Sequence, residues 1–172
     1  MIQSRTTPKG FTLIELILYV AIASILLTVI SLFLSTVIKS RLKQQSMTEV
    51  ESQGLQIMEQ ITRTIRSAET INSPTSGNNS NTLSLGMSNG SQNPTVFESS
   101  GSQIQITEGT GSPIALSNGR VNISNLDFKN LSRADTPGLI QVEFDLDHVN
   151  NSGRNEYTFS KSFSTSSSLR HP

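Results

Sequence analysis

A long apolar stretch near the amino terminus constrains this chain more than any other feature. From Phe11 to Ile38 the side chains are apolar apart from hydroxyl residues and one acid, Glu15, and a short leader with Arg5 and Lys9 precedes them. A helix needs about 20 apolar residues to cross a bilayer, and this stretch is longer. The pattern therefore predicts a single membrane-spanning helix.

Glu15 is the only charged residue in this stretch. A carboxylate at the centre of a span costs about 2.5 to 3.5 kcal/mol, so it requires a partner or a favourable position. Glu15 lies in the first turns of the predicted helix, where the macrodipole stabilises negative charge. The deeper residues supply no cation, so the stretch itself gives Glu15 no counter-charge.

The residues before and including Glu15 resemble the processing site of the type IV prepilin family. The match is to a basic residue, a glycine, an aromatic residue, apolar or small residues and a glutamate, here KGFTLIE at 9–15. The resemblance implies that an inner-membrane aspartyl peptidase, prepilin peptidase, recognises Lys9 and Gly10, cuts between Gly10 and Phe11, and methylates the new amino group of Phe11. It also implies that Glu15 pairs with the terminal amine of a neighbouring subunit during assembly into a helical filament.

The spacing of these groups agrees with such a pairing. A new ammonium on Phe11 and the carboxylate of Glu15 lie about 6 Å apart along a helix axis, at 1.5 Å rise per residue. Opposite charges attract strongly in a medium of low dielectric constant, which favours a staggered neighbour that brings them together. Each subunit would then supply one cation and one anion.

Three other interpretations of the stretch remain open. Ala21-Ile22-Ala23 has the small-x-small form of a signal-peptidase site, although Glu15 falls inside the apolar core and the run continues to Ile38. An ordinary single-pass anchor with an interfacial acid is the second. The third is the buried helix of a soluble domain, which the polar composition of the remaining chain disfavours.

Composition limits the chemistry of the rest. The chain has no Cys, which excludes disulfides, thiolate metal sites and Cys nucleophiles. Asp145 and Asp147 share one face of a predicted strand and His148 lies on the other, so we expect a solvated face rather than a metal or acid-base site. We predict no catalytic residue, no cofactor and no metal ligand. Some pseudopilins bind calcium through loop carboxylates, and Asp127 or Asp135 could contribute to such a site.

Basic side chains cluster where the apolar stretch ends, at Lys39, Arg41 and Lys43, a position typical of a membrane boundary. This cluster opposes the orientation signal of the leader, so the resemblance, rather than charge, indicates that the leader is cytoplasmic. The chain carries thirteen basic and thirteen acidic residues. The lack of a basic patch for phosphate contacts argues against direct nucleic-acid binding.

A helical pattern continues beyond the membrane stretch. Apolar residues recur three or four apart, at Val50, Leu55, Ile57, Met58, Ile61, Ile65 and Ala68. No Pro occurs between Phe11 and Ser73, and Gly54 is the one weak point, so we expect one continuous helix that Ser73-Pro74 ends. Packing of this stripe against a sheet is the preferred interpretation, and a coiled coil is the alternative.

Short alternating segments follow a polar connector at 75–81. Their alternating apolar positions are Leu83 and Leu85; Ile104 and Ile106; Val121, Ile123, Leu126 and Phe128; and Ile140, Val142, Phe144 and Leu146. A returning strand with Tyr157, Phe159, Lys161 and Phe163 follows. The break at Ser124-Asn125 predicts a bulge, and Asn150 to Gly153 predicts a turn. We expect an α+β fold in which the amphipathic half of the helix covers the dry face of an antiparallel sheet.

This layout is also that of the pilin fold, and the head more loosely resembles J-type minor pseudopilins and related minor pilins. The missing Cys pair and the missing helix Pro depart from many major pilins. The expected divisions are a leader at 1–10, a transmembrane or filament-core half-helix at 11–38, an amphipathic half-helix at 39–72, a β-sheet head at 73–166 and a flexible tail at 167–172.

The resemblance implies a structural subunit, not an enzyme, in a type IV pilus-like or type II secretion pseudopilus filament. Its expected partners are prepilin peptidase, other pilin or pseudopilin subunits, the inner-membrane assembly platform and, before assembly, membrane lipid. The expected location is the bacterial inner membrane, in a single pass with the head outside the cytoplasm, and then an extracellular or periplasmic filament. The alternatives are a competence pseudopilin for DNA uptake and a single-pass anchor that presents a ligand-binding β domain.

Overall fold

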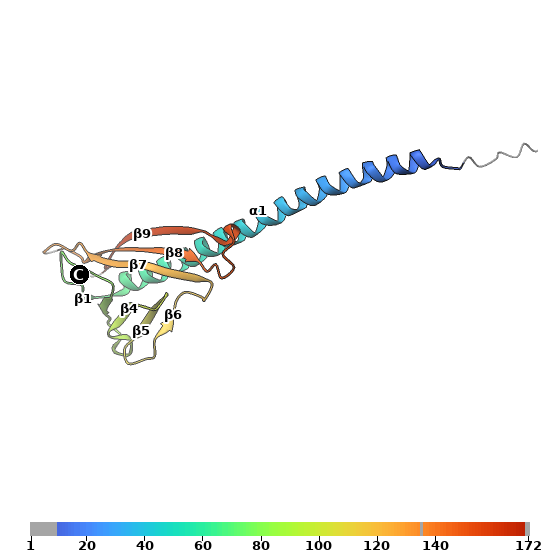
Figure 1. Cartoon of the computed structure of the whole chain (residues 1–172). Coiled ribbons are helices and arrows are strands. Elements are labelled where there is room, and N and C mark those ends of the chain that lie inside the picture. Colours follow the sequence, from blue (N-terminus) through green and yellow to red (C-terminus); the bar gives the residue numbers. More distant parts are fainter. Residues whose placement is uncertain (1–9, 135, 171–172) are drawn as a thin grey trace, which may run out of the picture. The chain divides into compact units, whose positions relative to one another are not determined.

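The computed structural model describes residues 10–134 and 136–170. The chain divides into two compact units, an anchor unit at 1–41 and a head unit at 42–172, and a single helix, α1, runs through both. The elements are α1 (Leu13–Ser67), β1 (Thr70–Ser73), β2 (Asn79–Ser80), β3 (Leu83–Gly86), η1 (Gly90–Gln92), β4 (Thr95–Ser100), β5 (Gln103–Glu108), β6 (Ile114–Ala115), β7 (Val121–Asn130), β8 (Leu139–His148), η2 (Asn155–Tyr157) and β9 (Ser160–Ser168). The expected α+β class, one long helix with antiparallel sheets, is confirmed (Figure 1).

The anchor unit consists of the first half of α1. Among the described residues, α1 is the one helix long and apolar enough to cross a membrane. Its large apolar side chains are exposed on every side of this half, from Leu13 to Ile38. Because such a surface is unfavourable in water, this half-helix requires lipid or other helices around it.

α1 ends five residues earlier than the sequence predicted. Its last residue is Ser67, and Thr70–Ser73 forms β1, which pairs antiparallel with β3. The Glu69 N–H donates to the carbonyl of Gly86 at 2.9 Å, so the backbone finds sheet partners at this point. The predicted helix end at 72 is therefore wrong, because β-branched residues in β1 and a residue preceding Pro both favour extended backbone.

The head contains two antiparallel sheets, not the single sheet that was expected. One has the strand order β1-β3-β4-β5-β6 and the other has the order β2-β7-β8-β9. Asn79 and Ser80, in the predicted polar connector, form β2 and pair with Lys129 and Phe128 of β7. The connector therefore carries the chain from one sheet to the other and back, and Figure 1 shows β7, β8 and β9 alongside the second half of α1.

Both sheets and the second half of α1 share one core. Val50, Ile57, Ile61 and Ile65 of α1 are at most 1% exposed, so most of the predicted stripe packs inside the head and is not available for a coiled coil. Leu55 is the exception, because 65% of it is exposed. The largest fully buried side chains from the sheets are Phe97, Phe128 and Phe144. Burying large aromatic residues removes about 150 to 250 Å² of surface each from water, which makes them the main stabilising groups of this core.

Gly54 of α1 faces Phe163 of β9. A Cβ atom at this position would overlap the ring of Phe163. The ring of Phe163 stacks on Phe144 with centroids 5.5 Å apart and planes inclined by 20°. The residue that weakens the helical pattern therefore permits the contact between α1 and the four-stranded sheet.

The predicted bulge in β7 is confirmed. The pairing of β7 with β8 shifts register between Ser124 and Asp127, and Asn125 has a φ of 53°. Asparagine tolerates this left-handed conformation better than most residues. Its side-chain amide donates to Oδ2 of Asp145 at 2.7 Å, which fixes the bulge against β8.

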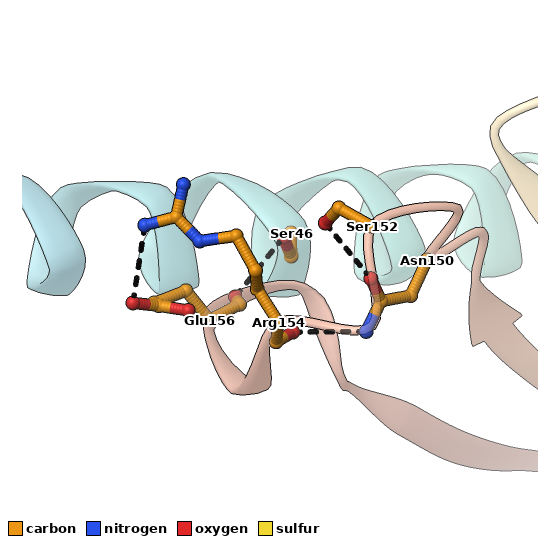
Figure 2. Close-up of polar contacts among 5 residues, drawn as sticks. All are labelled: Ser46, Asn150, Ser152, Arg154 and Glu156. Carbon is orange, nitrogen blue, oxygen red and sulfur yellow. Dashed lines mark hydrogen bonds and ion pairs between the residues drawn. The ribbon is translucent and has the colours of Figure 1, made fainter.

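The predicted turn at Asn150 to Gly153 belongs to a longer loop that contacts α1. The Nδ2 of Asn150 donates to the carbonyl of Arg154 at 2.9 Å, and Ser152 donates to Oδ1 of Asn150 at 3.2 Å. Ser46 of α1 donates to the carbonyl of Glu156 at 3.5 Å, as Figure 2 shows. This hydrogen bond joins the loop to α1 at one end of the head.

The predicted flexible tail is largely part of the fold. β9 extends to Ser168, and the next residue, Leu169, is 5% exposed and donates its N–H to the carbonyl of Gly138 at 2.8 Å. The tail prediction is wrong for these positions because the segment continues a strand that is paired with β8 and alternates between outward and inward residues, among them the buried Ser167. Residues 171–172 of the predicted tail lie outside the described residues.

Candidate functional site

The first residues of α1 form a capped helix start. Thr12 precedes the helix, and its Oγ1 accepts a hydrogen bond from the N–H of Glu15 at 3.3 Å. The N–H of Leu16 donates to the carbonyl of Thr12 at 3.2 Å. Thr and Glu three residues apart have the spacing of a capping box, which satisfies helix-start donors that otherwise lack partners. The sequence therefore places Glu15 in the first turn, where the helix dipole favours its charge.

The side chains of Phe11, Glu15 and Tyr19 lie on one side of the helix start. Tyr19 Oη donates to Oε1 of Glu15 at 3.5 Å, and the rings of Phe11 and Tyr19 meet edge to face with centroids 6.2 Å apart. None of the ion pairs in the described part of the chain involves Glu15. The structure therefore brings the predicted cleavage residue Phe11 close to an acid that has no cation partner.

Gly10 precedes this helix start and is exposed. An added Cβ would meet no atom within 4 Å. Lys9, the predicted leader-recognition residue, lies outside the described residues. Tyr19 was not among the residues predicted from sequence, although its four-residue spacing from Glu15 is the signal that could have found it.

A model of the prokaryotic N-terminal methylation motif matches residues 5–31. The chain therefore carries the processing motif of type IV prepilins and pseudopilins, which supports its resemblance to that family. Comparisons with curated proteins and with solved structures gave no match. The matched segment contains the helix start and most of the anchor unit of this prepilin, and it does not extend to the head.

The motif and the apolar helix together support a role as a type IV pilin or pseudopilin subunit. The motif family implies processing by prepilin peptidase and assembly with other pilin subunits. The exposed apolar surface of the anchor unit indicates membrane anchoring before assembly into a filament.

The residues of the head that were considered as metal ligands or acid-base groups do not form such a site among the described residues. Asp127 accepts a hydrogen bond from Nδ2 of Asn79 at 2.9 Å, and Asp135 lies outside the described residues. His148 stacks on Tyr157 with centroids 6.0 Å apart, and its buried Nδ1 has no hydrogen-bond partner among the described residues. No group of three possible metal ligands occurs in the part that the structure describes.

Asn130 has a structural role in the head. It is 4% exposed, and its Nδ2 donates to the carbonyl of Pro74 at 2.7 Å. Its Oδ1 accepts the N–H of Ser132 at 3.0 Å. Because the amide is buried and hydrogen-bonded through both its nitrogen and its oxygen, it holds the connector against β7.

Asp145 provides a pH-dependent contribution to head stability. Hydrogen bonds from Ser162 and Asn125 hold the pKa of Asp145 below its ordinary value of 3.8, against a small opposing effect of burial. A carboxyl whose pKa is lowered by folding adds stability above its unfolded pKa, and this stability is lost as pH falls through the folded pKa. We expect Asp145→Asn to destabilise the head at pH 7 and to have a smaller effect near pH 3.

Urea unfolding of wild type and variant at the two pH values measures this difference. Asp147→Asn is the matched control, because the described residues make no hydrogen bond to that side chain. A difference between wild type and Asp145→Asn that stays constant from pH 7 to pH 3 would contradict the prediction.

Proposed function

We propose that this prepilin is a minor structural subunit of a type IV pilus-like or type II secretion pseudopilus filament and has no enzymatic activity. Prepilin peptidase cuts it between Gly10 and Phe11 and methylates the new amino group of Phe11. The observation that carries the proposal is the position of Glu15, a lone acid on an otherwise apolar half-helix, on the same side of the helix start as Phe11.

Glu15 supports a filament role because the anchor unit leaves its charge without a cation. An ionised carboxylate near the apolar part of a bilayer is costly unless it is paired. Once Phe11 is the first residue, a neighbouring subunit displaced along the helix axis supplies an ammonium at the required place. Lipid does not supply such a fixed cation, so pairing favours the assembled state over the lone anchor.

The proposed partners follow from the two units. The leader and helix start engage prepilin peptidase, the apolar half of α1 contacts lipid and then the helices of other subunits, and the inner-membrane assembly platform moves the subunit between these surroundings. The head then lies outside the cytoplasm. A minor subunit is favoured over a major one because the chain lacks the Cys pair of many major pilins and has no Pro within α1.

Glu15→Leu tests the proposal. The change removes a costly charge, so cleavage and membrane insertion should be unaffected or improved. Recovery of the subunit in sheared filaments should fall about tenfold or more, since loss of about 1.4 kcal/mol of pairing free energy is tenfold in an association constant. A subunit at the filament tip has no neighbour above it and would show a smaller loss.

Glu69→Leu is the matched control, because it removes an exposed acid from the head and leaves the helix start intact. Cleavage, insertion and filament recovery are compared for wild type and both variants by immunoblotting. Equal recovery of Glu15→Leu and wild type contradicts the proposal and favours a lone anchor that presents the β head.

A further inference from the structure

Two surfaces of opposite charge lie on the head unit. The first, the arginine groove, runs between α1 and the end of β9 and is lined by Leu55, Met58, Arg63, Arg66, Ser168 and Arg170, among others. The second, the acidic face, consists of Asp127 of β7 and Glu143, Asp145 and Asp147 of β8. Neither surface belongs to the helix start that carries the processing motif.

The arginine groove has unneutralised positive charge. Arg63 is paired with Glu59 at 2.6 Å, so this pair adds no net charge. Arg66 and Arg170 are exposed, and their side chains form no ion pair or hydrogen bond with the described residues. Leu55, on the same wall, is 65% exposed. The groove thus combines apolar surface with two free guanidinium groups, a composition typical of contacts with an acidic protein surface.

The acidic face has an excess of negative charge. Glu143, Asp145 and Asp147 are two residues apart on β8, which places their side chains on the same side of the strand. Asp127 lies directly opposite Glu143 in the pairing of β7 with β8. Like charges in directly opposite positions destabilise a sheet, so this arrangement is unfavourable in the isolated head.

One cation, Lys129, lies on the same outer side of β7 two residues from Asp127, so the four acids still outnumber the basic side chains of this face. Asp145 and Asp127 accept hydrogen bonds from the amides of Asn125 and Asn79, and none of the four acids forms an ion pair there. On the neighbouring strand, Ser164 lies opposite Glu143 and Ser162 lies opposite Asp145. These short side chains do not cover the carboxylates, so the face is open to a cationic partner.

The two surfaces do not overlap. Phe144 and Leu146 alternate with the acids on β8 and are buried in the core, on the side of the sheet that α1 covers. The acids therefore lie on the outer side of the sheet, whereas the groove follows α1 and the end of β9. A contact between such non-identical patches is heterologous, and repeated heterologous contacts form open helical arrays.

We infer that the arginine groove of one head binds the acidic face of a second copy of this chain. The inference rests on the proposed function, because assembly brings heads next to one another, and it requires that two copies of this minor subunit be neighbours. Charge complementarity between two surfaces of the same chain selects a second copy as the occupant. The contact relieves the repulsion between Asp127 and Glu143 and gives Arg66 and Arg170 the partners that they lack.

Crosslinking in the full-length chain tests the contact, because the chain has no Cys of its own. Ser67→Cys places a thiol at the groove and Ser164→Cys places one beside Glu143, without changing any charge. The two single-Cys chains carry different tags and are produced together with prepilin peptidase and the filament machinery. A short bis-maleimide should join the two differently tagged chains, whereas each single-Cys chain produced alone should give little dimer.

Charge reversal then tests the role of the side chains. Arg66→Glu in the Ser67→Cys chain, or Glu143→Arg in the Ser164→Cys chain, should lower the mixed product about fivefold, because one attraction becomes a repulsion. The two reversals together should restore most of the product. A structural defect in either head would not be rescued in this way. Ser67→Cys with Ser99→Cys, an exposed position on β4 of the other sheet, is the control pair.

Recovery in sheared filaments separates this inference from the proposed function. Chains that enter filaments without a mixed product, or that crosslink only to another protein, overturn the contact and leave the filament role intact. A mixed product from chains that never enter filaments supports the contact and contradicts the filament role. If the chains neither form the mixed product nor enter filaments, the contact and the filament role are both overturned.

Discussion

Gly10→Val is expected to leave the prepilin uncut in cells that contain prepilin peptidase. A glycine at this position gives the peptidase an unobstructed backbone next to the cut, and the structure shows open space around it. Valine adds a β-branched side chain that stiffens the segment before the helix. Mass spectrometry should find a wild-type chain that begins at N-methylated Phe11 and a variant that retains residues 1–10.

Gly90→Val is the control, because this head glycine also has open space around it and lies far along the chain from the cut. Its processing should equal that of wild type. Normal cleavage of Gly10→Val would contradict the assignment of the cleavage site. A wild-type chain that begins at Ser24 would instead establish signal-peptidase cleavage after Ala23.

Gly54→Val is expected to lower the free energy of unfolding of the head by about 2 to 3 kcal/mol. Its side chain would overlap Phe163, and forcing extra atoms into a packed core costs about 1 to 3 kcal/mol. The small gain in helix propensity over glycine offsets only part of this cost. Urea unfolding of residues 42–172, which contain the entire head core, measures the loss.

Phe163→Ala identifies the cause of that loss. Alone it should be strongly destabilising, because it removes the stack on Phe144 and creates a cavity. Combined with Gly54→Val it should cost less than the sum of the two single changes, since the valine then occupies space left by the ring. Additive effects would show that the overlap with Phe163 is not the source of the instability.

The sequence predicted the elements with strong periodicity. The apolar run and the three-four spacing that follows it predict one long helix, and inward residues alternate along β8 and on both sides of the bulge in β7. The bulge at Asn125 was visible because the alternation changes phase there. The processing motif was visible because its residues are adjacent in the chain and need no fold to bring them together.

The features that sequence did not predict depend on contacts between distant segments. β2 has two residues, and only its pairing with β7 makes it a strand. The end of β9 is rich in serine, a composition typical of tails, and its order comes from β8 and from Gly138. The arginine groove joins residues of α1 to Arg170, more than a hundred positions away, so no local pattern could indicate it.

The hydroxyl residues of the anchor unit have a consequence for how the subunit changes surroundings. Ser24, Thr28, Ser31, Ser35 and Thr36 each donate to the carbonyl four residues earlier, at 2.7 to 3.1 Å. The hydroxyl protons thus have hydrogen-bond acceptors within the helix and need no partner outside it. Such a surface is equally suited to acyl chains and to neighbouring helices, so extraction from the bilayer breaks no hydrogen bond of these five groups. For these five positions, release from the membrane therefore exchanges one apolar environment for another, and Glu15 remains the polar group of this half-helix whose surroundings change.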